Sequence, residues 1–160
     1  MIELRTPAEI DRLRIAGEFV GSVLTATAAA SAVGVNLLEL DALAHDMIRA
    51  RGAESCYIDY HPSFGGSPFG KVICTSVNDA ALHGLPHDYR LRDGDVLSLD
   101  FAASVDGWVS DSAVTIIVGT PRPEDQRLIE VTSRALDAGI AAATVGNRIG
   151  DISAAIGDVA

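Results

Sequence analysis

Residues 96–105 (VLSLDFAASV) and 108–118 (WVSDSAVTIIV), separated by the dipeptide Asp106-Gly107, decide the fold of this chain. Both stretches are rich in β-branched and apolar residues, and Asp-Gly between two such stretches is a strong signal for a two-residue hairpin turn. The pattern therefore predicts an antiparallel hairpin with three diagnostic pairs: Val105 with Trp108, Ala102 with Asp111, and Asp100 with Ala113.

Two aspartates, Asp100 and Asp111, interrupt these strands, where aspartate is disfavoured. In the expected register they share one face of the sheet as diagonal neighbours, roughly 7–8 Å apart. Converging carboxylates repel each other unless a cation lies between them, so a divalent metal or a metal pair would satisfy both. The alternative is that both merely face solvent, as on the wet side of many antiparallel sheets. A one-residue bulge would place them on opposite faces.

The composition excludes several classes of function. The 160 residues carry a net charge of −10, which disfavours nucleic acids and anionic membrane surfaces. The start of the chain lacks the pattern of a signal peptide, and no stretch is apolar enough for a membrane span. The two cysteines, Cys56 and Cys74, form no motif and fit reduced thiols. We therefore expect a cytoplasmic globular protein.

Helical patterns precede the hairpin and follow it. Thr6, Pro7 and Glu9 form a capping box, and the helix that they open should stop at Gly34. A second helix should run from Asn36 to Gly52, strand-like residues occupy 71–77, and a third helix should open at residues 120–124 and run to about residue 144.

The end of the chain repeats part of its beginning. Val33-Gly34 and the helix after them recur as Val145-Gly146 and its helix, at an offset of 112 positions. This predicts a duplicated helix–helix–sheet unit that is incomplete in its second copy. Residues 1–160 would then form one domain, in which residues 121–160 are the first two helices of the second repeat. Chance similarity between two amphipathic helices is the alternative.

Two motifs before the hairpin complete a family resemblance. Residues 75–86 (TSVNDAALHGLP) resemble the Ser-x-Asn…His-Gly-x-Pro segment of type I methionine aminopeptidases, most closely the actinobacterial-type members. Residues 91–96 (LRDGDV) follow, and then the two aspartates, eleven residues apart. The resemblance covers nearly the whole chain.

This resemblance implies an α+β pita-bread fold, truncated here to an antiparallel sheet with helices packed on one face. It implies a metallopeptidase that removes the initiator methionine from nascent polypeptide N-termini by means of a metal-activated water. The cofactors would be two divalent metal ions (Co, Mn, Fe or Zn), and Asp100 and Asp111 match the family's first two metal ligands.

The resemblance also implies a substrate site. His83 matches the catalytic histidine that contacts substrate near the scissile bond, and Cys74 matches a residue of the methionine pocket. Aromatic walls of that pocket would come from Tyr60, Phe64 and Phe69, although residues 65–68 look inserted relative to other members. His83 as an ordinary loop histidine and Cys74 as core packing are the alternatives.

The family's remaining ligands, one histidine and two glutamates, have no match in these 160 residues. Two carboxylates are few ligands for a catalytic metal, so we expect weakened metal binding and doubtful activity of this chain alone. A non-catalytic peptide- or protein-binding remnant of the same fold is the alternative function. Self-association through the exposed half-sheet is a further expectation.

Overall fold

The computed structural model describes residues 3–61 and 66–160, which form two compact units, residues 1–119 and 120–160. In its described residues, the first unit contains two helices and a four-stranded antiparallel sheet: α1 (Pro7–Ala30), α2 (Leu37–Arg51), β1 (Glu54–Ser55), β2 (Cys74–Val77), β3 (Val96–Val105) and β4 (Trp108–Ile117). The second unit contains α3 (Pro123–Ala142) and α4 (Ile149–Gly157). None of the helices in the described part of the chain combines the length and the apolar character that a membrane span requires.

The sheet is built around β3. Along one stretch β3 pairs with β1, along another with β2, and over its full length with β4. The β3–β4 register contains all three predicted pairs: Val105 with Trp108, Ala102 with Asp111, and Asp100 with Ala113. The hairpin prediction is therefore confirmed, including its turn at Asp106-Gly107, where both residues have positive φ.

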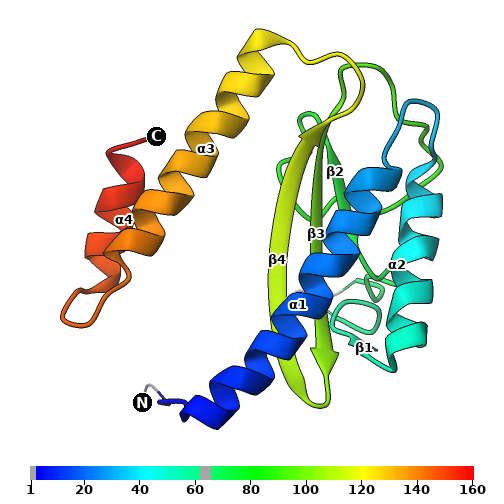
Figure 1. Cartoon of the computed structure of the whole chain (residues 1–160). Coiled ribbons are helices and arrows are strands. Elements are labelled where there is room, and N and C mark those ends of the chain that lie inside the picture. Colours follow the sequence, from blue (N-terminus) through cyan, green and yellow to red (C-terminus); the bar gives the residue numbers. More distant parts are fainter. Residues whose placement is uncertain (1–2, 62–65) are drawn as a thin grey trace. The chain divides into compact units, whose positions relative to one another are not determined.

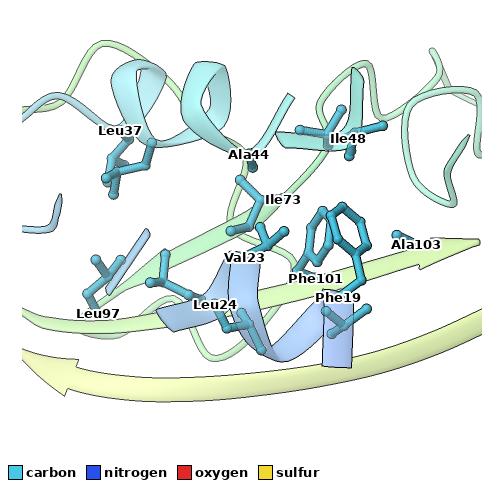
Figure 2. Packing of buried hydrophobic residues seen from close by; sticks show 14 of the residues in the cluster. Phe19, Val23, Leu24, Leu37, Ala44, Ile48, Ile73, Leu97, Phe101 and Ala103 are labelled. Carbon is cyan, nitrogen blue, oxygen red and sulfur yellow. The ribbon is translucent and has the colours of Figure 1, made fainter. Parts of the chain in front are cut away.

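One face of the sheet is covered by α1, with α2 beside that helix (Figure 1). The alternate residues Leu97, Leu99 and Phe101 of β3 are fully buried against this layer. The ring of Phe19 on α1 meets Phe101 edge-on at 6.3 Å, and side chains of α2 close the other side of the core (Figure 2). Because side chains alternate along a strand, Asp100 points to the opposite face of the sheet.

The helix starts agree with the predicted caps. Glu9 N–H donates to the Thr6 hydroxyl at 3.4 Å, and Thr6 N–H donates to the Glu9 carboxylate at 2.7 Å. Asn36 and Glu39 form the same reciprocal box at the start of α2, and Gly52 ends that helix in a left-handed conformation.

Two predicted boundaries were wrong. Helix α1 ends at Ala30, because the left-handed Gly34 instead turns the chain so that its N–H reaches the Leu91 carbonyl. Strand β2 begins only at Cys74, since Val72 N–H donates to the Asp41 carboxylate rather than to a strand. Helix α3 begins at Pro123, inside the predicted start at residues 120–124, because a residue that precedes proline avoids the helical region.

The indole of Trp108 lies at the hairpin turn beneath two cationic groups. The guanidinium carbon of Arg5 is 5.7 Å from the ring centroid, and that of Arg12 is 6.0 Å away. Both distances suit cation–π attraction, which links the start of the chain and the first turns of α1 to β4.

The second unit keeps the offset of the predicted repeat. Helices α1 and α3 end at Ala30 and Ala142, and α2 and α4 begin at Leu37 and Ile149, each 112 positions apart. Gly34 and Gly146 have similar positive φ angles, 91° and 98°. These agreements support our proposal that residues 121–160 are the first two helices of a second repeat.

Candidate metal and substrate site

The two aspartates stand side by side on the sheet face away from α1. Asp111 on β4 is opposite Ala102, which is two residues along β3 from Asp100. The continuous β3–β4 ladder contains no bulge, so both side chains share one face. Asp100 is half-buried, and Asp111 is exposed.

A tyrosine hydroxyl joins the two carboxylates. Tyr57 Oη donates to Asp100 Oδ1 at 2.8 Å and lies 3.5 Å from Asp111 Oδ1. The short strand β1 positions this tyrosine, since Ser55 pairs with Ala103 and Cys56 N–H donates to the Ala102 carbonyl. The Tyr57 ring also meets the Phe69 ring edge-on at 5.9 Å.

Negative charge is concentrated around the carboxylates of Asp100 and Asp111. Burial, the charge of Asp100 and hydrogen bonding with Asp100 raise the pKa of Asp111, and the Tyr57 hydroxyl partly offsets this rise. Burial and the two carboxylates raise the pKa of Cys74 to about 12. Burial, the hydrogen bond to Asp100 and the nearby charges also raise the pKa of Tyr57, so its hydroxyl remains a donor. A cation would relieve this repulsion.

The carboxylates form part of the lining of a cavity of about 410 Å³. Six residues predicted for the site line it, namely Asp100, Asp111, His83, Cys74, Tyr60 and Phe69. Phe64, the seventh, lies outside the described residues. Three further lining residues are Cys56, Tyr57 and Ser67. The cavity thus combines aromatic rings and thiols with one carboxylate pair, which suits a side chain that is mainly apolar.

His83 reaches this cavity from the loop after β2. Its φ angle is +57°, a left-handed value that costs energy in a non-glycine residue. The following Gly84 is anchored to the edge of β2: its carbonyl accepts from Thr75 N–H at 2.7 Å, and its N–H donates to the Ser76 hydroxyl at 3.0 Å. These bonds hold the histidine against the sheet that carries the aspartates.

The other end of that loop is fixed by Asp95. Its carboxylate accepts from the Asn78 amide, the Tyr89 hydroxyl and the Arg92 N–H, all within 3.0 Å. Burial acts to raise the pKa of Asp95, but these hydrogen bonds and the Arg92 charge outweigh it, so the pKa lies below its ordinary value. Asn78 also bonds Val96 through both its backbone N–H and its side-chain oxygen. Both ends of the His83 loop are therefore tied to the sheet.

Known proteins are similar to this chain over almost its whole length. The sequence profile of metallopeptidase family M24 matches residues 11–160. The chain belongs to this family. A methionine aminopeptidase of Aquifex aeolicus is 38% identical to this M24 chain over 99% of its length, and methionine aminopeptidase 1 of Mycobacterium tuberculosis is 40% identical over 98%.

Solved structures of a methionine aminopeptidase and of a prolidase agree with the fold. A methionine aminopeptidase from Rickettsia prowazekii superposes with a TM-score of 0.93 at 31% identity, covering 99% of this chain and 62% of that one. The prolidase from Pyrococcus furiosus, at 20% identity and a TM-score of 0.81, shares the fold alone. The predicted pita-bread fold is thus confirmed. The chain spans about three-fifths of the length of the curated relatives, 62% and 57% for the two above.

Membership of a metallopeptidase family implies a divalent metal cofactor. The side chains at the site can be compared with the ligands that such a metal requires. Asp100 and Asp111 present oxygen ligands that Mn, Fe, Co and Zn accept, and their mutual repulsion suits a bound cation. Within residues 3–61 and 66–160, no group of three or more His, Cys, Asp or Glu side chains could hold a metal ion. The aspartates therefore fit two positions of a coordination sphere and leave the others to water or to groups outside the described residues.

Sequence reasoning missed Tyr57 and Cys56 as site residues. Both follow β1, a strand of only two residues whose pairing partners lie almost fifty positions away. Such a short strand has no periodicity to detect. A usable signal was the clustering of Tyr57 with Tyr60 and Phe69 shortly before the β2 cysteine, which marks the segment as aromatic.

Proposed function

We propose that this chain carries the metal-binding carboxylates and the methionine pocket of a methionine aminopeptidase, which removes the initiator methionine from nascent polypeptides. The observation that carries this proposal is the convergence of Asp100 and Asp111 on the cavity that His83 also lines. Relatives named methionine aminopeptidase, similar over nearly all of the chain, support the same reading.

Each site residue receives a role in this proposal. Asp100 and Asp111 would hold two divalent cations, weakly, because they supply only two ligands. A bound cation would supply the Lewis acidity that lowers the pKa of a water molecule. His83 orients the substrate beside the scissile peptide bond through its imidazole. Cys74, Tyr60 and Phe69 surround the substrate's thioether side chain, which makes favourable contacts with aromatic rings.

The test is methionine release from a Met-Ala peptide by the purified chain in the presence of Co²⁺ or Mn²⁺. The control is the double variant Asp100→Ala/Asp111→Ala, with folding checked for both proteins. Release that is lost in the variant is the expected sign of a working site. Absence of release from a folded chain, with either metal, would contradict the sufficiency of these residues for chemistry.

A non-catalytic peptide-binding role is the second candidate. The observation that favours it is the lack of a third metal-ligating side chain among the described residues, together with an intact cavity. In this case a peptide beginning with methionine binds without turnover, and the matching peptide beginning with lysine does not. Calorimetric titration with both peptides separates binding from catalysis.

We further propose self-association through the half-sheet. Within the described part of the chain, β4 pairs only with β3, which leaves one long strand edge open. The chain should therefore sediment as a dimer at high concentration, and a concentration-independent monomer would exclude this.

We place the protein in the cytoplasm because both cysteines are free thiols, and its acidic charge disfavours nucleic acids and anionic membranes as partners.

A further inference from the structure

Tyr57 stands where the two carboxylates converge, although it belongs to no expected ligand set. Its hydroxyl is within 2.8 Å of Asp100 Oδ1 and 3.5 Å of Asp111 Oδ1. The ring is held from the side by Phe69, and the backbone is held by the β1–β3 pairing. The Phe69 contact and the β1–β3 pairing therefore fix the position of the hydroxyl.

The Tyr57 hydroxyl stabilises the negative charge of the carboxylate pair, as a bound cation would do more strongly. It contributes one hydrogen, which it donates to Asp100 Oδ1 at 2.8 Å, while its oxygen lies 3.5 Å from Asp111 Oδ1. A hydrogen bond to an ionised group is about twice as strong as one between neutral groups. Both oxygens belong to the carboxylates that would hold a metal.

We propose that Tyr57 is a positioning residue that stabilises the metal-free carboxylate pair. Its hydroxyl gives up its contacts with the carboxylate oxygens when a divalent cation binds. The hydroxyl then competes with the cation, and it lowers the metal affinity while keeping the empty site ordered. This inference rests on the proposed metal site and adds a residue that tunes it.

The variant Tyr57→Phe removes the hydroxyl and keeps the ring. We expect it to bind Mn²⁺ about tenfold more tightly than the natural chain, as measured by calorimetric titration, because the metal-free state loses a charge-assisted hydrogen bond. Tyr60→Phe is the matched control, since Tyr60 lines the same cavity but its hydroxyl makes no described hydrogen bond to either aspartate. Its Mn²⁺ affinity should equal that of the natural chain.

A thermal measurement separates this role from a merely structural one. Without metal, Tyr57→Phe should melt below the natural chain, and saturating Mn²⁺ should close the gap, because only the metal-free state uses the bond. A gap of equal size with and without Mn²⁺ would overturn the inference.

The binding outcomes also distinguish the inference from the proposed function. Equal or weaker Mn²⁺ binding by Tyr57→Phe overturns the competition and leaves the metal site in place. Loss of binding in Asp100→Ala/Asp111→Ala confirms that the measured ion occupies the carboxylate pair. If neither the natural chain nor Tyr57→Phe binds Mn²⁺, both the metal site and the inference fail.

Discussion

Gly84 lies so close to Thr75 that a β-carbon built on Gly84 would stand 2.4 Å from the Thr75 carbonyl oxygen. No side chain tolerates such an approach to backbone, so the residue after His83 must be glycine for the loop to lie on β2. The requirement comes from packing and not from φ, because Gly84 is not among the residues with positive φ.

Replacement of Gly84 by alanine should therefore push the His83 loop away from β2. We expect a loss of about 2–4 kcal/mol in the free energy of unfolding, the range typical of strong overpacking and lost hydrogen bonds. Urea denaturation measures it. The control is Gly21→Ala, where a β-carbon meets nothing within 4 Å and alanine favours the helix by about 1 kcal/mol. Equal stability of the two variants would contradict the close approach.

Asp95 should make stability depend on pH in the acid range. Its pKa is lower in the folded chain than in the unfolded one, so the unfolded state binds the extra proton and stability falls as pH drops through the folded-state pKa. Asp95 is only 6% exposed, and Asp95→Asn should cost about 2–3 kcal/mol at pH 7. The cost should shrink as the pH falls below about 4, where the Asp95 carboxyl of the unfolded chain takes up a proton before that of the folded chain does.

Denaturation of both proteins at several pH values tests this expectation. Asp79→Asn, at an exposed position of the same loop, serves as the control and should follow the natural chain at every pH. A cost of Asp95→Asn that stays constant down to pH 3 would show that charge plays no part.

Two leucines 112 positions apart should respond differently to truncation. Leu24 is 6% exposed in the core of the first unit, whereas Leu136 is 60% exposed on α3. We expect Leu24→Ala to cost about 2–5 kcal/mol and Leu136→Ala less than about 1 kcal/mol. Calorimetric unfolding of each variant provides the comparison, and a large cost at Leu136 would mean that its face is covered in solution.

Asp111→Asn should separate stability from metal binding. Removal of one charge of a repelling pair should leave the metal-free chain at least as heat-stable as before at pH 7. The same change should abolish the rise in melting temperature that Mn²⁺ gives. Asp106→Asn is the control, because asparagine accepts the positive φ of the hairpin turn. A Mn²⁺ response retained in Asp111→Asn would argue against Asp111 as a ligand.

The parts of the fold that were predictable are those governed by local rules. The Asp106-Gly107 turn determines the pairing of all ten residues on each strand, which is why the placement of Asp100 and Asp111 followed from sequence alone. Capping boxes at Thr6 and Asn36 marked two helix starts for the same reason.

The rest depends on contacts between distant residues. Gly34 looked like a helix stop, but its conformation serves a bond to Leu91, 57 positions later. Tyr57 reaches the carboxylates only because β1 pairs with the far end of β3. The Asp95 network joins Asn78, Tyr89 and Arg92, none of which shows a periodic pattern.

The cation-flanked indole at the hairpin turn gives the chain a selective optical reporter. Trp108 is the single tryptophan of the sequence and belongs to the first compact unit. Its fluorescence emission therefore follows the sheet and α1, including release of the Arg5 and Arg12 groups from its ring. Far-ultraviolet circular dichroism follows the helices of both units. If residues 120–160 melt on their own, the dichroism curve acquires a transition that the emission curve lacks.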